Sequence, residues 1–270
     1  MPPPDGTGDA SHHLELVDRL AVNVRLMTQN IYDDPGFYAG YSRLPRSLKG
    51  LDGAPEWPAS RAMLPAMHGR RVLDLGCGFG WFCRWARARG AAYVRGIDVS
   101  ENMLTRARAD TADTAIVYAR GDLDHLDLAG ERFDLVYSSL ALHYISKLED
   151  LFATIHAALP PGGPLVFSVE HPIYTAPTRP GWVEDAAGHK TWPVDAYSVE
   201  GPRQTDWLAK GVIKQHRTVA TYLTLLLRQG FALSHIDEWS PSDAQAAGNP
   251  ALRDERRRPM FLLLGVHKTL

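Results

Sequence analysis

Short apolar runs alternate with amphipathic segments through the middle of the chain. The apolar runs at 71–75, 93–99, 115–118, 133–137 and 165–169 have the length of strands and are nearly continuous. Such runs are typical of strands that are covered on both faces. Segments with helical spacing, at 81–89, 101–109 and 147–159, lie between several of them. Because strands that alternate with helices form a parallel sheet, the pattern predicts a doubly wound α/β domain.

The two ends of the chain depart from this alternation. Residues 12–31 place apolar side chains at steps of three and four, which predicts an amphipathic helix at the start of an N-terminal helical cap over residues 11–60. Residues 171–213 carry five prolines and three tryptophans, which predicts an insertion after the fifth strand. A helix at 217–229, a strand at 231–237, a polar loop at 240–258 and a last strand at 260–267 follow. Two strands joined by a loop predict a terminal antiparallel hairpin at the sheet edge.

The composition of the chain mainly excludes certain classes of protein. The chain has 270 residues, of which 45% are hydrophobic and 22% are charged, so it can bury one full α/β core. We expect residues 11–270 to form a single domain, and residues 1–10, which are rich in proline and glycine, to be a disordered tail and not a signal peptide. The net charge of −2 gives no global attraction to nucleic acid or to anionic lipid.

The remaining exclusions concern metals and membranes. The two cysteines, Cys77 and Cys83, have neither a disulfide framework nor zinc-ligand spacing around them, so we expect reduced, buried thiols and no metal. No apolar run reaches the ~18 residues of a membrane span. We therefore expect a cytoplasmic protein.

A glycine-rich turn follows the first strand. Three alternating glycines, Gly76, Gly78 and Gly80, stand between an apolar strand and a helix, where a ligand can approach the backbone closely. The dinucleotide fingerprint requires a glycine at the position of Trp81. The acid Asp74 would repel a pyrophosphate but suits a cationic amino acid. The turn thus favours an adenosyl amino acid over NAD as ligand.

Acidic residues also follow the second and third strands. Asp98 stands at a strand tip, where a carboxylate can accept hydrogen bonds from both ribose hydroxyls, although NAD enzymes share this feature. Asp122 and Leu123 follow the third strand, where the acid can accept from an adenine amino group beside an apolar side chain. An ordinary turn explains Asp122 equally well.

Together, the segments 72–80, 98, 121–123 and 133–145 resemble class I S-adenosylmethionine-dependent methyltransferases. The flanking segments 46–51, 56–57, 168–172 and 258–260 resemble one subgroup of bacterial small-molecule methyltransferases. The resemblance implies a Rossmann-like, seven-stranded, mostly parallel sheet with an antiparallel last strand. It implies S-adenosylmethionine as the cofactor, with its methionine moiety on the glycine turn, its ribose on Asp98 and its adenine on Asp122 and Leu123. The predicted cofactor residues are Tyr41, Arg46, Asp74, Gly76, Cys77, Gly78, Asp98, Val99, Met103, Asp122, Leu123 and Ser138.

The acceptor is expected at the carboxyl ends of the fourth and fifth strands. His143, Glu170 and His171 follow these strands, and we predict that they line the acceptor side, with one histidine as general base for an in-line displacement. Two alternatives stay open: His143 caps a turn, or His171 only orients the insertion. Residues 138–141, Ser-Ser-Leu-Ala, lack the Asn/Asp-Pro-Pro-aromatic motif of methyltransferases that act on exocyclic base nitrogens.

The sequence therefore predicts methyl transfer to a small-molecule O-, N- or C-nucleophile by a monomer or homodimer. An NAD-dependent oxidoreductase and a non-catalytic cofactor-binding module are the alternatives. An RNA methyltransferase is disfavoured because the charge is near neutral and no basic domain is appended.

Overall fold

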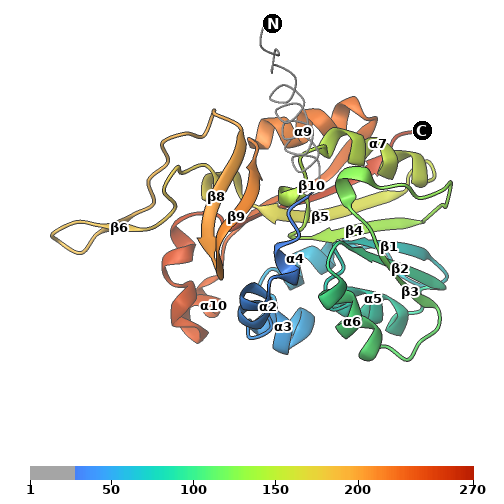
Figure 1. The fold of residues 1–270 in the computed structure, drawn as a ribbon. Coiled ribbons are helices and arrows are strands. Elements are labelled where there is room, and N and C mark those ends of the chain that lie inside the picture. The colour runs from blue at the N-terminus through green and yellow to red at the C-terminus, as the bar shows by residue number, and fades with distance from the viewer. Residues whose placement is uncertain (1–27) are drawn as a thin grey trace, which may run out of the picture.

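A seven-stranded sheet forms the centre of the computed structural model, which describes residues 28–270 (Figure 1). Its strand order is β10-β11-β5-β4-β1-β2-β3. The bounds are β1 Arg71–Leu75, β2 Tyr93–Asp98, β3 Ile116–Arg120, β4 Leu135–Ser139, β5 Pro164–Glu170, β10 Phe231–Trp239 and β11 Phe261–Lys268. Strands β1 to β5 pair in parallel, and β11 is antiparallel to both β5 and β10. The predicted sheet, with its antiparallel last strand and its terminal hairpin, is confirmed.

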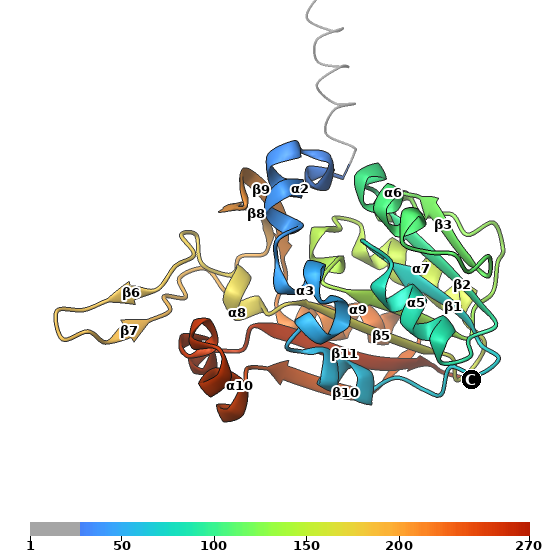
Figure 2. The ribbon, with the colours of Figure 1, turned by 90° about the horizontal axis from the view of Figure 1, so that it is seen from below.

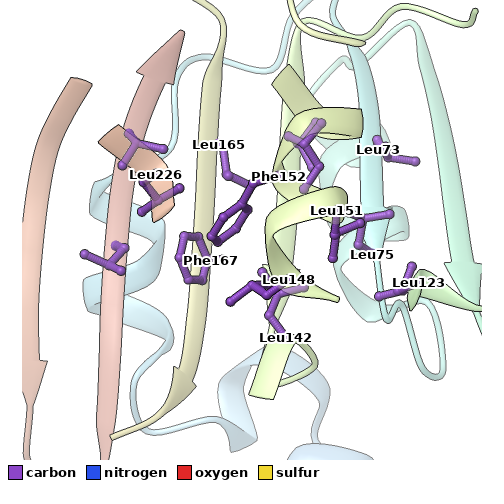
Figure 3. Close-up of a cluster of buried hydrophobic side chains, with 14 of the residues drawn as sticks. Leu73, Leu75, Leu123, Leu142, Leu148, Leu151, Phe152, Leu165, Phe167 and Leu226 are labelled. Atoms are coloured by element: carbon purple, nitrogen blue, oxygen red, sulfur yellow. The ribbon is translucent and has the colours of Figure 1, made fainter. Parts of the chain in front are cut away.

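Helices cover both faces of the sheet. Helices α5 (Trp81–Ala88) and α6 (Glu101–Ala109) lie on one face, and α7 (Leu148–Ala158) and α9 (Val219–Arg228) lie on the other (Figures 1 and 2). Figure 3 shows the core beneath α7, where Phe152 faces Phe167 of β5 with 5.7 Å between ring centroids. Continuous apolar strands are explained by this two-sided coverage.

The N-terminal cap lies over the carboxyl ends of the strands. Its described part contains α2 (Pro35–Tyr41), α3 (Pro45–Leu48), α4 (Trp57–Ala62) and short 3₁₀ turns at Ile31–Asp33 and Gly50–Gly53. The helix predicted at 12–31 and the tail predicted at 1–10 lie outside the described residues, apart from residues 28–31.

The insertion contains more structure than the sequence predicts. After α8 (Pro172–Thr175), the short strands β6 (Val183–Glu184) and β7 (Lys190–Thr191) form an arm that projects from the body (Figures 1 and 2). A second hairpin, β8 (Gly201–Trp207) and β9 (Ala209–His216), stands beside the N-terminal cap. The predicted polar loop at 240–258 contains α10 (Asp243–Gly248) and 3₁₀ turns at Pro250–Leu252 and Asp254–Arg257. None of the helices that the structure describes is long and apolar enough to cross a membrane.

Candidate active site

A cavity of about 270 Å³, here called the inner cavity, lies at the carboxyl ends of the parallel strands. It is bounded by the glycine turn after β1, the tips of β2, β4 and β5, the N-terminal cap and the insertion. Nine of the predicted cofactor residues line it: Tyr41, Arg46, Gly76, Gly78, Asp98, Val99, Met103, Asp122 and Leu123. Of the predicted acceptor-side residues, His143 and Glu170 line it and His171 does not.

The glycine turn has the shape of a ligand cradle. Gly76 and Gly78 have φ of +74° and +52°, in the left-handed region that favours glycine. A Cβ on Gly76 would collide with Ala141, whereas a Cβ on Gly78 would meet no atom within 4 Å. Since Gly78 also lines the inner cavity, its missing side chain leaves room that a ligand can fill.

Asp98 is the buried acid beside this turn. Its two carboxylate oxygens accept hydrogen bonds from the backbone N–H groups of Gly78, at 2.8 Å, and Ser100, at 2.9 Å. Burial raises the pKa of Asp98 to about 6, although these backbone donors act in the opposite direction. Each carboxylate oxygen keeps lone pairs for a further donor, as a ribose diol requires.

Asp122 and Leu123 form the far end of the inner cavity. The Thr28 hydroxyl lies 2.6 Å from Asp122 Oδ1 and 2.8 Å from Asp124 Oδ2, which joins the start of the described chain to this wall. Leu123 is buried beside them. An acceptor carboxylate next to an apolar side chain suits the amino group and the ring of an adenine.

Arg46 brings a positive charge from the cap to the inner cavity. Its Nη2 lies 3.1 and 3.2 Å from the two carboxylate oxygens of Glu56, which is only 2% exposed. Burial opposes the charge of Arg46, but Glu56 and the neighbouring tyrosines together outweigh burial and raise the pKa of Arg46. The guanidinium thus stays charged at the cavity wall, where it can pair with a ligand carboxylate.

Three predicted cofactor residues lie behind the wall instead of on it. Asp74 accepts a hydrogen bond from the Cys83 thiol at 3.2 Å, and burial raises its pKa to about 7. The Cys77 side chain is buried in the core with Cys83, and burial raises its pKa to about 11. The Ser138 hydroxyl donates to the carbonyl of Leu75 at 2.7 Å. Because side chains alternate along β4, the next residue, Ser139, lines the cavity in its place.

His143 reaches the inner cavity as a neutral imidazole. Its Nδ1 accepts a hydrogen bond from the Glu170 backbone N–H at 3.3 Å, and its side chain is 2% exposed. Burial lowers the pKa of His143 to about 4. A neutral ring that accepts at Nδ1 carries its proton on Nε2. His143 therefore offers a hydrogen-bond donor, which does not suit the predicted role of a general base.

Glu170 forms a buried ion pair with the insertion. Its Oε1 lies 2.5 Å from Nζ of Lys214 on β9, whose side chain is 3% exposed. Burial opposes the ionisation of Glu170, but the charge and hydrogen bond of Lys214, together with other positive charges nearby, outweigh burial and lower the pKa of Glu170. The second oxygen, Oε2, is buried and has no hydrogen-bond partner among residues 28–270. Glu170 is thus ionised, with one acceptor oxygen to spare.

His171 has a structural position, which corrects its predicted place at the acceptor. Its Nδ1 accepts from the Ile173 backbone N–H at 3.0 Å and so caps α8, and its Nε2 lies 2.9 Å from Glu238 Oε1 on β10. Both ring nitrogens are engaged, and the ring does not line the inner cavity. The alternative that His171 orients the insertion fits these contacts.

A second, outer cavity of about 630 Å³ adjoins the inner one. The two share Glu170, Tyr174, Trp207 and Glu255 in their walls. Lys214, Trp182, Trp192 and Arg258 also line the outer cavity. Sequence reasoning did not select these residues as site residues, nor Tyr144 and Phe261 of the inner cavity. The only signal in the sequence is the unusual density of tryptophan in the insertion.

The comparisons with known proteins agree with this geometry. Residues 73–167 match the model of a methyltransferase domain. A crystal structure of an S-adenosylmethionine-dependent methyltransferase from Mesorhizobium loti is 62% identical, with a TM-score of 0.78, and covers 81% of this chain and 100% of that chain. A solved structure from Listeria monocytogenes is 41% identical, with a TM-score of 0.74, and covers 80% of this chain and 99% of that chain. A malonyl-[acyl-carrier protein] O-methyltransferase of Enterobacter lignolyticus is 40% identical over 110 residues, which are 41% of this chain and 43% of that protein.

Proposed function

Because the chain belongs to the S-adenosylmethionine-dependent methyltransferases, we propose that it transfers a methyl group to a small-molecule acceptor at the junction of the inner and outer cavities. The observation that carries the proposal is the shared wall of the two cavities, which places Glu170 between the cofactor residues and the insertion. A restricted cavity with aromatic walls and a few polar groups suits a small molecule.

The cofactor is S-adenosylmethionine, and the residues of the inner cavity fit its parts. Gly78 leaves room for the methionine moiety, and Arg46 would pair with its carboxylate. Asp98 would accept hydrogen bonds from the ribose hydroxyls, while Asp122 and Leu123 would hold the adenine; all three residues line the inner cavity. Bound in this way, the cofactor supplies an electrophilic methyl group on a positively charged sulfur.

The protein contributes position and electrostatics to the transfer. The inner cavity confines the acceptor and the methyl donor together, which is the main requirement of an in-line displacement. Glu170 Oε2 accepts a hydrogen bond from an N–H or O–H nucleophile and stabilises the positive charge that develops on it. His143 donates from Nε2 and orients the acceptor. The general base is thus a carboxylate and not a histidine.

The insertion decides which acceptor fits. The match to the malonyl-[acyl-carrier protein] O-methyltransferase covers less than half of that protein, so its acceptor gives no guide to the acceptor here. The outer cavity is built from residues 170–214 and 255–258, which lie beyond the matched methyltransferase domain at 73–167. Nucleic acid is disfavoured by the net charge of −2.

The experiment uses S-adenosylmethionine with a deuterated methyl group. The protein is incubated with this donor and a bacterial lysate separated into metabolite, protein and RNA fractions, and the label is followed by mass spectrometry. We expect the label in the metabolite fraction, and its loss with Glu170→Gln. Label in RNA or protein alone would contradict the proposal. Calorimetry with S-adenosylhomocysteine and with NADH, of which only the first should bind, tests the cofactor separately.

A further inference from the structure

Unsatisfied polar atoms gather on one wall of the outer cavity. Nine buried side-chain polar atoms of the described residues have no hydrogen-bond partner. Three of them belong to this wall and have no ion-pair partner either: Glu170 Oε2, Arg258 Nε and Arg258 Nη1. A fourth atom of the wall, Glu255 Oε2, lies 2.8 Å from Nη2 of Arg258 and is thereby paired. Buried polar groups are nearly always paired in folded proteins, so three unpaired atoms in one place indicate a ligand that pairs with them.

The hydrogen-bonding character of these atoms describes the ligand. The carboxylate oxygen Glu170 Oε2 requires a donor, and the two guanidinium nitrogens of Arg258 require acceptors. The formal charges of the wall cancel, because Glu170 pairs with Lys214 at 2.5 Å and Glu255 pairs with Arg258 at 2.8 Å. A ligand that carries only one sign of charge would make the net charge of the site non-zero. A ligand with an ammonium and a carboxylate keeps the net charge at zero.

The order of the charges along the wall orients such a ligand. Glu170 and Glu255 line both cavities, whereas Arg258 lines only the outer one. An ammonium group that donates to Glu170 Oε2 would lie at the junction of the two cavities, toward the transferable methyl group. A ligand carboxylate that pairs with Arg258 would lie in the outer cavity, farther from the cofactor residues. Since Glu255 and Arg258 are in direct contact, the two ligand groups must be close together, as they are in an α-amino acid.

Aromatic rings form the remainder of this site. The Arg258 guanidinium lies 3.9 Å from the ring centroid of Trp192, 4.5 Å from that of Tyr174 and 5.1 Å from that of Trp182. These contacts hold the arginine in place, with its side chain 4% exposed. The indole N–H of Trp192 donates to the Ile173 carbonyl at 3.0 Å, which fixes the ring. The half-buried faces of these rings suit a flat apolar side chain.

We propose that the methyl acceptor is an α-amino acid with an aromatic side chain, held by its carboxylate on Arg258 and methylated on its amino nitrogen beside Glu170. This inference rests on the proposed function. The ammonium first loses a proton to solvent by way of Glu170. The lone pair of the amine then forms the N–C bond while the C–S bond breaks, and its electron pair stays on sulfur. The products are an N-methyl ammonium, S-adenosylhomocysteine and one released proton.

The test is a binding comparison of three probes that share one ring. L-tryptophan carries both charged groups, tryptamine lacks the carboxylate and indole-3-propionate lacks the amine. Each is titrated by calorimetry into protein saturated with S-adenosylhomocysteine. We expect tryptophan to bind at least about tenfold more tightly than either analogue, because each analogue loses one charged hydrogen-bonded contact.

Variants test which residue binds the carboxylate of the probe and which binds its amine. Arg258→Gln should weaken tryptophan about tenfold and leave tryptamine unchanged, and Arg258→Lys should restore part of the loss. Glu170→Gln should weaken tryptophan and tryptamine but not indole-3-propionate. Arg257→Gln, an exposed neighbour in the same loop, is the matched control and should bind all three as the wild type does.

Three results would overturn the inference: equal binding of the three probes, no binding of tryptophan at millimolar concentration, or equal losses for all probes in Arg258→Gln. The last would mean that Arg258 only holds the arm. Each of these leaves the affinity for S-adenosylhomocysteine intact. Failure of the proposed function would instead appear as loss of S-adenosylhomocysteine binding itself, so the two failures are distinguishable.

Discussion

The pH dependence of cofactor affinity tests the role of Asp98. Burial raises the pKa of Asp98 to about 6, and only the ionised carboxylate can accept from both ribose hydroxyls. Lowering the pH from 7.5 to 5 reduces the ionised fraction from nearly all to about one tenth. Affinity for S-adenosylhomocysteine should therefore fall about tenfold, or about 1.4 kcal/mol, with most of the loss below pH 6.

Calorimetry at matched ionic strength measures this loss, and Asp98→Asn provides the control. The amide cannot ionise, so the variant should bind more weakly at pH 7.5 and show little change down to pH 5. Other ionisable groups do not explain a step near pH 6: burial lowers the pKa of His143 to about 4, and Asp74, with a pKa raised to about 7, lies behind the cavity wall. An unchanged affinity between pH 7.5 and 5, or the same slope in Asp98→Asn, would refute the reasoning.

Three further predictions concern the turn, the cap and the acceptor side. Gly78→Val should abolish S-adenosylhomocysteine binding in a folded protein, while Gly130→Val, which has a similar positive φ but lies away from the cavity, should bind normally; calorimetry and circular dichroism check both. Hydrogen exchange of residues 32–58 should slow when S-adenosylhomocysteine binds, and equal exchange with and without it would argue against a closing cap. His171→Ala should lower the free energy of unfolding by about 1 kcal/mol through loss of the α8 cap, with little change in kcat, whereas Glu170→Gln should lower kcat by about 10²-fold or more. A kinetic loss in His171→Ala equal to that in Glu170→Gln would contradict the placement of His171.

The sequence predicted the sheet, and most of the cofactor residues that it predicted line the inner cavity, because both signals are local. Apolar runs set the strands, and the glycine turn with Asp98 and Asp122 stands directly at their ends. One difference from the prediction is a shift of one residue along β4. Ser138 and Ser139 are equivalent in a sequence pattern, and only the alternation of β4 decides that Ser139 faces the cavity.

The acceptor side depends on contacts between distant segments, which no local pattern reports. His171 is withdrawn from the cavity by Glu238, which is 67 positions away, and Glu170 is paired with Lys214, which is 44 positions away. The strand β8, Gly-Pro-Arg-Gln-Thr-Asp-Trp, has no alternation of apolar residues, so its hairpin with β9 was missed. Trp207, which closes the junction of the two cavities, stands on that hairpin.

The central claim is that one continuous space joins the cofactor to an acceptor held by the insertion. The most direct test is a crystal structure of the protein with S-adenosylhomocysteine. We expect its methionine moiety beside Gly78, its ribose hydroxyls on Asp98, and its sulfur directed toward Glu170 and His143 at the junction of the cavities. A sulfur directed away from Glu170, or a ligand outside the inner cavity, would contradict the account.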